Sequence, residues 1–314
     1  MSESRHNPDQ LLKEIQADEE KRNKGHLKIF FGYAAGVGKT YAMLEAAHME
    51  KQQGIDVVAG YVETHARPKT AALLNGLEVL PTREVFYNGM ILDEFDIGMA
   101  LKRKPQLILV DELAHTNAEG CRHAKRYQDI KELLNAGIDV YTTVNVQHIE
   151  SLCDTVASIT EIVVRERIPD SIFDNADQVE LIDIEPQDLI NRLNTENVYR
   201  QTQEKQAVEN FFTIENLTAL REISLRRCAD RVNILTENTR IKNHGDYHTG
   251  EHILVCLSSS PSNAKIIRTA AKMASAFKGE FTALFVETPD FSVMSEENVK
   301  RLRSNICLAE QLGA

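Results

Sequence analysis

The sequence predicts an α/β fold built on a parallel sheet with helices on both faces. Short apolar runs alternate with helical patterns along most of the 314-residue chain, which is the order that produces parallel βαβ units. One apolar run leads into a glycine-rich turn that closes on Gly38, Lys39 and Thr40. Another, Leu107–Val110, ends on two acidic residues. Such turns and strand ends carry ligands in open parallel sheets.

The elements of the first part can be placed in order. An amphipathic helix is expected at 9–23, within a charged leader, 1–24. The predicted strands are 27–31, 56–62, 84–87, 107–111, 139–143, 161–164 and 179–183. The predicted helices are 40–53, 69–75, 91–103, 127–135 and 147–158. From 186 to 238 the strand signals stop, and spaced apolar positions among charges predict helices that pack back onto the sheet.

A second unit is expected after a turn-rich linker. We divide the chain into the leader 1–24, a first domain 25–240, the linker 241–250 and a partial domain 251–314. In the partial domain, the sequence predicts a strand at 252–257, a helix ending at 277, a strand at 280–286 and a helix at 295–312. Two parallel strands are too few for an independent domain, because both faces of such a sheet must be covered. The sequence thus suggests a fragment, a shortened natural form, or a domain completed by association.

Composition narrows the class of protein. The formal net charge of −11 argues against a nonspecific nucleic-acid binder, because a negatively charged protein surface would repel the phosphates of the nucleic-acid backbone. The five cysteines lie far apart and the ten histidines show no metal-ligand spacing, so neither zinc nor a disulfide framework is indicated. No apolar run approaches the roughly 18 residues that a membrane helix needs. We therefore expect a cytoplasmic protein with a small-molecule or protein partner.

The turn between Gly32 and Thr40 has the layout of a phosphate-binding P-loop. Backbone N–H groups would surround phosphate oxygens, the lysine would reach the terminal phosphates, and the threonine would ligate Mg²⁺. The predicted nucleotide-binding residues are Gly32, Gly36, Val37, Gly38, Lys39, Thr40 and Tyr41. The usual pattern would place its first glycine at the position of Tyr33. The alternative is a loop that merely turns a strand into a helix.

The acidic strand end supplies the partner that a P-loop requires. Asp111 would hold Mg²⁺ together with Thr40, and Glu112 would position an attacking water if ATP is hydrolysed. Other polar residues follow nearby strands and could line the same crevice: Glu63, His65, Arg67, Arg122 and Arg126. Spacing alone leaves open whether these residues bind phosphate or form loop ion pairs. The serine-rich turn 258–262 could also hold phosphate or ribose, or simply cap a helix through Ser262.

Several ordered motifs resemble the N-terminal cytoplasmic region of the KdpD family of potassium and osmotic-stress sensor histidine kinases. They are residues 35–44, 60–65, 109–117, 125–129, 141–148 and 216–221. The resemblance runs from about Gly25 to the end of the sequence. It implies a P-loop domain that binds ATP and Mg²⁺, followed by a universal-stress-protein-like domain. The family usually has a small residue in place of Tyr33 and proline in place of Ala35.

The resemblance also implies a second ligand, cyclic di-AMP. Some family members bind it through Ser-x-Ser, twenty residues, and then Phe-Thr-Ala-x-Tyr. The matching residues here are Ser258, Ser260, Phe281, Thr282, Ala283 and Phe285, with the last in place of the tyrosine. Loss of that hydroxyl removes one hydrogen bond and keeps an aromatic face. We expect weakened rather than abolished binding.

The resemblance predicts a regulatory module rather than a complete kinase. Its partners would be the kinase core and membrane region of a full-length sensor or a potassium transport complex, and a response regulator through the kinase. No nucleic acid is expected, and a homodimer is compatible with the sequence. The phospho-accepting helix and kinase ATP lid are not found in these 314 residues, so autophosphorylation by them is not expected. At most slow ATP hydrolysis is expected, because regulation needs only differential binding between two conformations. The alternatives are a true ATPase or small-molecule kinase that uses Glu112, and a stand-alone nucleotide-binding regulator of a potassium transporter.

Overall fold

The computed structural model describes residues 24–64, 67–87, 89–195, 211–243, 252–277, 279–287 and 294–314. The chain divides into two compact units, Met1–Ala229 and Asp230–Ala314. The leader helix predicted at 9–23 lies outside the described residues. The predicted linker begins within the last turn of α10 (Ile214–Asn243), and its remainder, 244–250, also lies outside them.

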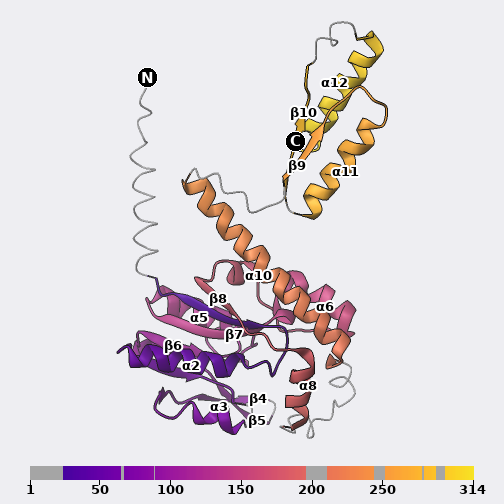
Figure 1. Ribbon diagram of the computed structural model, residues 1–314. Coiled ribbons are helices and arrows are strands. Elements are labelled where there is room, and N and C mark those ends of the chain that lie inside the picture. Colours follow the sequence, from indigo (N-terminus) through magenta and orange to yellow (C-terminus); the bar gives the residue numbers. More distant parts are fainter. Residues whose placement is uncertain are drawn as a thin grey trace, which may run out of the picture. The chain divides into compact units, whose positions relative to one another are not determined.

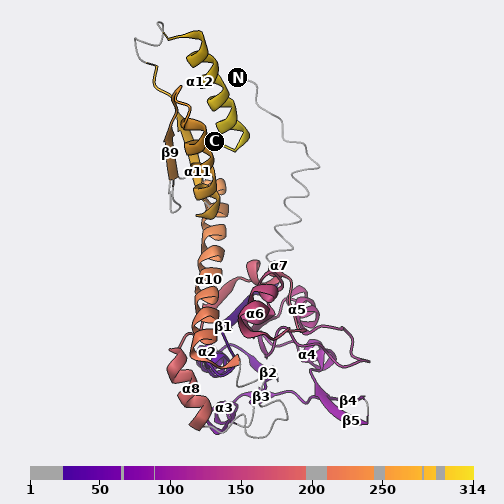
Figure 2. The ribbon, with the colours of Figure 1, turned by 90° about the vertical axis from the view of Figure 1, so that its right-hand side faces the viewer.

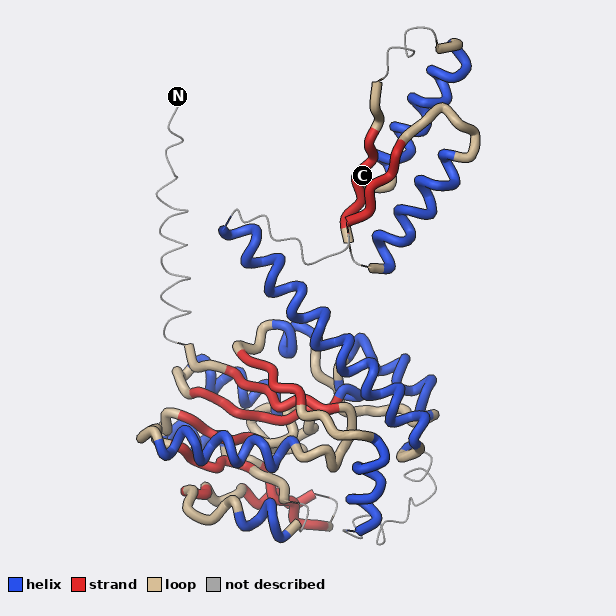
Figure 3. The backbone as a smooth tube through the Cα atoms, viewed as in Figure 1, coloured by secondary structure: helices blue, strands red, loops and turns tan. Residues whose placement is uncertain are grey.

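A six-stranded parallel sheet forms the centre of the first unit (Figures 1 and 3). Its strands are β1 (Leu27–Gly32), β2 (Val57–Tyr61), β3 (Glu78–Val79), β6 (Leu107–Val110), β7 (Asp139–Asn145) and β8 (Gln178–Leu181). They are ordered β3-β2-β6-β7-β1-β8, and every paired neighbour is parallel. This arrangement confirms the predicted parallel α/β fold.

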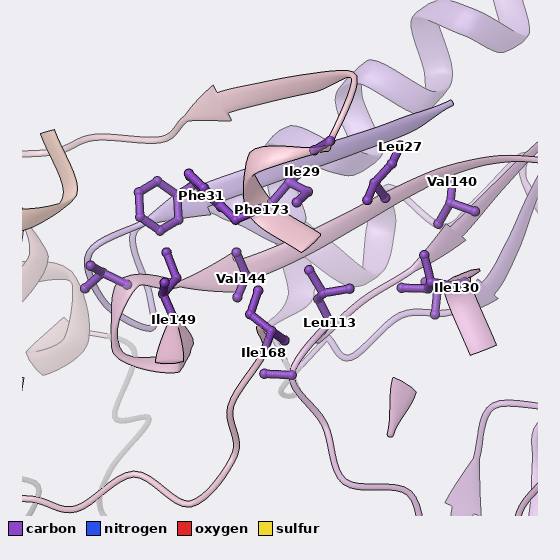
Figure 4. Packing of buried hydrophobic residues seen from close by; sticks show 14 of the residues in the cluster. Leu27, Ile29, Phe31, Leu113, Ile130, Val140, Val144, Ile149, Ile168 and Phe173 are labelled. Atoms are coloured by element: carbon purple, nitrogen blue, oxygen red, sulfur yellow. The ribbon is translucent and has the colours of Figure 1, made fainter. Parts of the chain in front are cut away.

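The two faces of the sheet are covered by different helices because side chains alternate along β1. Phe30 points to the face of α2 (Lys39–Gln52), where Met43 and Leu44 bury it. Ile29 and Phe31 point to the other face, and Figure 4 shows the side chains that pack there. That face is covered by α4 (Ile97–Arg103), α5 (Arg126–Asn135), α6 (Cys153–Thr160), α7 (Asp170–Asp174) and the start of α10. Figure 1 shows α2 against its face, and α3 (Pro68–Ala72) contacts α2.

A β-hairpin replaces the beginning of the helix predicted at 91–103. Strands β4 (Arg83–Tyr87) and β5 (Met90–Glu94) pair antiparallel and project from the first unit (Figure 2). Tyr87 pairs with Met90, and Gly89 before it has φ 84°, in the left-handed region that a tight hairpin turn requires. Asn-Gly is a strong signal for such a turn, and it outweighed the helical periodicity that follows.

Two further predictions near residue 150 need correction. The strand predicted at 161–164 is absent from the described sheet, because Glu161 ends α6 in the left-handed conformation. The helix predicted at 147–158 begins as two short 3₁₀ turns, η1 (Val146–His148) and η2 (Glu150–Leu152). Ile149, between them, bridges to Ile168. A pairing that distant in sequence leaves no local signal.

The second unit contains the four predicted elements. Strands β9 (His252–Cys256) and β10 (Glu280–Leu284) are parallel and pack with α11 (Asn263–Ala276) and α12 (Glu296–Gln311). Val255 and Phe281 lie inside the small core. The opposite sheet face carries Leu254 and Leu284, which are 59% and 41% exposed. Within both units, the described helices include none that is long and apolar enough to cross a bilayer.

We expect Phe173→Ala to destabilise the first unit by about 3–5 kcal/mol, because the cavity would open in a dry core. The Phe173 ring is fully buried and meets the Phe31 ring edge-on, with centroids 4.8 Å apart. Phe86→Ala is the matched control, because Phe86 is 76% exposed on the hairpin, and its cost should stay within about 0.5 kcal/mol. Urea unfolding followed by circular dichroism measures both. Equal losses would contradict this account of the core.

Candidate nucleotide-binding site

The loop between β1 and α2 has a backbone that only glycine adopts readily. Gly36 has φ 90° and Gly38 has φ 109°, both in the left-handed region. A Cβ atom at Gly32 would lie 2.7 Å from Cγ2 of Val37, so a side chain there would push the loop apart. These constraints produce a tight turn at the carboxyl end of β1, directly before the first turn of α2.

Lys39 is a buried cation at the end of this loop. Its side chain folds back, and Nζ donates a hydrogen bond to the carbonyl oxygen of Ala34 at 2.9 Å. Burial lowers the pKa of Lys39 to about 8; Asp111 and Glu112 raise it, and Arg67 lowers it further. An ammonium group held this way is poorly compensated, so an anionic ligand beside it would be strongly favoured.

Asp111 lies at the carboxyl end of β6 and accepts three hydrogen bonds. Thr40 Oγ1 donates to Asp111 Oδ2 at 3.0 Å, and the Glu112 N–H donates to Oδ1 at 3.0 Å. The Thr143 hydroxyl, from β7, also donates to Oδ1. The structure therefore places the two predicted magnesium residues, Thr40 and Asp111, in direct contact.

The donor atoms at this contact suit Mg²⁺. A threonine hydroxyl and a carboxylate are the oxygen ligands that Mg²⁺ takes, and it usually keeps several waters and adds phosphate oxygens. In the part of the chain that the structure describes, no group of three or more His, Cys, Asp or Glu side chains could hold a metal. Thr40 and Asp111 would therefore supply two of the oxygen ligands of a Mg²⁺ ion, with water and phosphate oxygens as the others.

A cavity of about 330 Å³ opens in front of the loop. It is lined by Ala35, Gly36, Gly38, Lys39, Thr40, Tyr41, Glu63, Thr64, Arg67, Thr70, Asp111, Glu112, Thr143 and Asn145. Among the predicted nucleotide-binding residues, Gly32 and Val37 lie behind this lining, where Val37 is buried in the core. The lining combines two cations with three carboxylates, so it offers both phosphate contacts and an environment for a divalent metal.

Glu112 reaches the same cavity by an unusual backbone conformation. Its φ is 58°, in the left-handed region that non-glycine residues rarely adopt. Arg126 Nη1 lies 3.8 Å from Glu112 Oε2. The carboxylate is therefore held over the cavity, next to Asp111, where it could orient a water molecule.

The other polar residues predicted for the crevice separate into two groups. Glu63 and Arg67 line the cavity, whereas His65 lies outside the described residues. Arg126 is fully buried, donates to Glu94 Oε2 at 3.0 Å, and lies 4.1 Å from the Tyr61 ring centre. Arg122 pairs with Glu132 of α5. For these last two arginines the structure shows the ion pairs that spacing had left open.

Sequence reasoning missed the contribution of β7. Thr143 and Asn145 line the cavity because β7 lies between β6 and β1, and Asn145 pairs with Gly32. The described residues offer the buried Oδ1 of Asn145 no hydrogen-bond partner. The strand order that brings these residues to the loop is a long-range property. The signals in the sequence were the polar end of a buried strand and the motif at 141–148, and neither assigned these two residues a role.

Tyr33 does not obstruct the cavity. Its side chain is fully buried behind the loop, and its hydroxyl donates to the carbonyl oxygen of Ile184 at 3.1 Å. Burial raises the pKa of Tyr33 to about 12, with Asp183 as a smaller cause in the same direction. The departure from the glycine pattern at this position is therefore a packing feature of the loop's rear face.

The serine-rich turn of the second unit is ordered by its own hydrogen bonds. The Ser258 N–H donates to Asn263 Oδ1 at 3.1 Å, and the Ser260 and Ser262 hydroxyl oxygens lie 2.9 Å apart. The turn follows β9 at its carboxyl end. On the parallel neighbour β10, Phe281 is buried in the core and the Thr282 hydroxyl lies 2.8 Å from a His252 nitrogen. Ala283 and Phe285 pack partly against the same core.

Comparison with known proteins gives consistent matches. A family model described as KdpD, the osmosensitive K⁺ channel His kinase sensor domain, matches residues 23–232. The sensor protein KdpD of Clostridium acetobutylicum is 54% identical over 98% of this chain and 34% of its own length. The Escherichia coli protein is 49% identical over 99% and 34%, and a putative KdpD of Synechocystis is 47% identical over 84% and 70%. The chain spans about a third of the length of the first two relatives.

We expect Lys39→Met to raise the thermal unfolding midpoint of the nucleotide-free chain near neutral pH. Methionine keeps an apolar stem and removes a buried charge. Folded wild type loses its Lys39 proton near pH 8, before the unfolded chain does near 10.5. Between these two pKa values the stability of the wild type rises with pH and that of the variant does not. The difference between their unfolding midpoints therefore narrows as the pH rises. Melting curves at about pH 7 and about pH 9 measure it; a gap that ignores pH would contradict the buried-charge account.

Proposed function

The chain belongs to the KdpD family of sensor proteins, and we propose that its first unit is a regulatory module that binds ATP and Mg²⁺ at the P-loop. The observation that carries this proposal is the 3.0 Å contact between Thr40 and Asp111 beside buried Lys39. A strand-end carboxylate, a first-turn hydroxyl and a lysine are the three groups that a P-loop uses for Mg²⁺ and phosphate.

Each group would have a distinct role in binding. The left-handed glycines, Gly36 and Gly38, turn the loop backbone so that its N–H groups can surround phosphate oxygens. Lys39 would exchange its bond to Ala34 for the terminal phosphates, and Arg67 supplies a second cation on the cavity wall. Bound Mg²⁺ would neutralise phosphate charge, while Thr40 and Asp111 hold it.

Regulation requires only that ATP binds one conformation better than another, so turnover can be slow or absent. Glu112 is the group that would orient a water in a true ATPase, which is the competing function. The two functions predict the same binding site and differ in the fate of the γ-phosphate. Glu112→Gln separates them because it removes the carboxylate and leaves the phosphate contacts in place.

We predict saturable ATP–Mg binding that Lys39→Ala weakens by about tenfold to hundredfold, because a hydrogen bond to a charged group contributes about 1.5–3 kcal/mol. Titration calorimetry measures the affinity. Lys51→Ala is the matched control: Lys51 is an exposed lysine in the last turn of the same helix, and its removal should change affinity less than twofold.

The same preparations decide between binding and catalysis. Phosphate release should stay at the level of Lys39→Ala. Release far above that level, abolished by Glu112→Gln with binding kept, would establish the ATPase instead. Absence of ATP binding by the wild type would refute the proposed function.

We further propose that the second unit binds cyclic di-AMP at the serine-rich turn. Support comes from the position of Ser258 and Ser260 after β9, at the sheet edge where ligands lie in parallel α/β folds. The turn presents hydroxyl groups, and the neighbouring strand continues towards the aromatic Phe285. These features fit phosphate and base contacts respectively.

We predict that Ser258→Ala with Ser260→Ala abolishes saturable binding of cyclic di-AMP to the whole chain. Phe285→Tyr should strengthen binding by about twofold to tenfold, because the restored hydroxyl adds about 0.5–1.5 kcal/mol. Thr269→Ala on the exposed surface of α11 is the control and should leave affinity unchanged. Calorimetry measures the affinity. If the wild type shows no heat of binding with cyclic di-AMP, this second proposal is refuted and the first is unaffected.

For the whole sensor, we propose that ligand occupancy controls a kinase core and, through it, a response regulator of potassium uptake. The matched family description, an osmosensitive K⁺ channel His kinase sensor domain, supports this setting. A stand-alone regulator that docks on a potassium transporter is the alternative. Under the first proposal the full-length protein autophosphorylates and Lys39→Ala alters the rate, whereas under the alternative the full-length protein shows no autophosphorylation.

A further inference from the structure

A helix that does not line the cavity packs against the rear of the P-loop. Arg192 of α8 (Pro186–Thr195) donates from Nη1 to the carbonyl oxygen of Gly36 at 3.2 Å. Leu189 and Leu193 of the same helix pack so closely that a Cβ atom at Gly36 would lie 3.1 and 3.0 Å from their methyl groups. The rear of the loop is therefore shaped by α8 as well as by its own glycines.

The segment that leads into α8, residues 182–185, is tied to the same loop and is called the strap here. The Ile182 N–H donates to the Phe31 carbonyl oxygen at 2.7 Å. The Tyr33 hydroxyl donates to the Ile184 carbonyl oxygen at 3.1 Å. These two bonds hold the strap beside the start of the loop.

Arg221 of α10 binds the two carboxylates of the strap, Asp183 and Glu185, which lie on either side of Ile184. Its Nε and Nη2 atoms donate to the Asp183 carboxylate at 2.9 and 2.7 Å, and Nη1 donates to Glu185 at 2.6 Å. Without this guanidinium, the two carboxylates would repel each other and the acceptor of the Tyr33 hydroxyl would lose its fixed position. Arg221 does not line the cavity.

We propose that Arg221 is a positioning residue for the P-loop, acting through the strap and Tyr33, so that nucleotide binding and the seating of α10 are energetically coupled. The proposal rests on the proposed nucleotide-binding function. Coupling between two sites is reciprocal. A change that loosens α10 at Arg221 therefore lowers the affinity for nucleotide, and bound nucleotide stabilises the packing of α10. The loop state would thereby be reported to a helix that runs on along the chain to Asn243.

The matched control is Arg227, six residues after Arg221 on α10. Its Nη2 donates to Asp174 of α7 at 2.6 Å, and its guanidinium lies 4.8 Å from the Phe173 ring centre. This arginine also anchors α10, but to α7 and not to the strap. A general loss of stability would affect both variants, whereas positioning of the loop singles out Arg221.

The test is ATP–Mg calorimetry on the whole chain carrying Arg221→Gln, Arg227→Gln or Tyr33→Phe. We expect about a fivefold loss of affinity or more for Arg221→Gln, a loss for Tyr33→Phe, and less than twofold for Arg227→Gln. The double variant of Tyr33 and Arg221 should lose less than the product of the single losses, because both act on one path. Wild-type affinity in Arg221→Gln, or equal losses in both arginine variants, would overturn the proposal.

A second measurement keeps the proposal testable apart from nucleotide binding. Amide hydrogen exchange of the nucleotide-free chain reports the order of the loop directly. Arg221→Gln should speed exchange in the peptide that covers 33–38, and Arg227→Gln should not. Unchanged exchange in Arg221→Gln would refute the positioning role. Faster exchange with no ATP binding by the wild type would uphold it and refute the nucleotide function.

Discussion

The Asp111 carboxylate is the interaction on which the rest of the site depends. It is 1% exposed, and a buried charge of this kind requires hydrogen bonds to both oxygens. The donors are Thr40, Thr143 and the N–H of Glu112, so one carboxylate joins the ends of β6 and β7 to the start of α2. Because α2 begins directly after the loop, this junction also sets the position of the glycine turn.

The charges that line the cavity support the proposed binding of a phosphate ligand together with a metal. Lys39 and Arg67 face Glu63, Asp111 and Glu112 across one cavity. A phosphate alone would meet the carboxylates unshielded, and a divalent cation alone would face Lys39. Bound together, the metal would shield the carboxylates from the phosphate, and the phosphate would pair with Lys39 and Arg67. The loop is also held from behind by α8 and the strap, so its shape is connected to a helix outside the cavity.

Local patterns predicted the loop and the acidic strand end, since Gly38-Lys39-Thr40 and Asp111-Glu112 each follow a buried strand that is visible in the sequence. Thr143 and Asn145 were missed because their place depends on β7 lying between β6 and β1. The same holds for Tyr33 and Arg221, whose partners lie about 150 and 38 residues away. Half of the hairpin at 83–94 was predicted: the strand predicted at 84–87 matches β4, whereas β5 falls in the region predicted as the helix 91–103, although the Asn-Gly signal for the turn is local.

The most direct test of the central contact is the effect of Mg²⁺ on ATP affinity in wild type and in Thr40→Val. Valine keeps the shape of the side chain and removes only the hydroxyl that meets Asp111. The account predicts that Mg²⁺ strengthens ATP binding in the wild type and that Thr40→Val loses most of this gain while keeping its Mg²⁺-free affinity. ATP binding that is indifferent to Mg²⁺ in the wild type, or an undiminished gain in Thr40→Val, would contradict it.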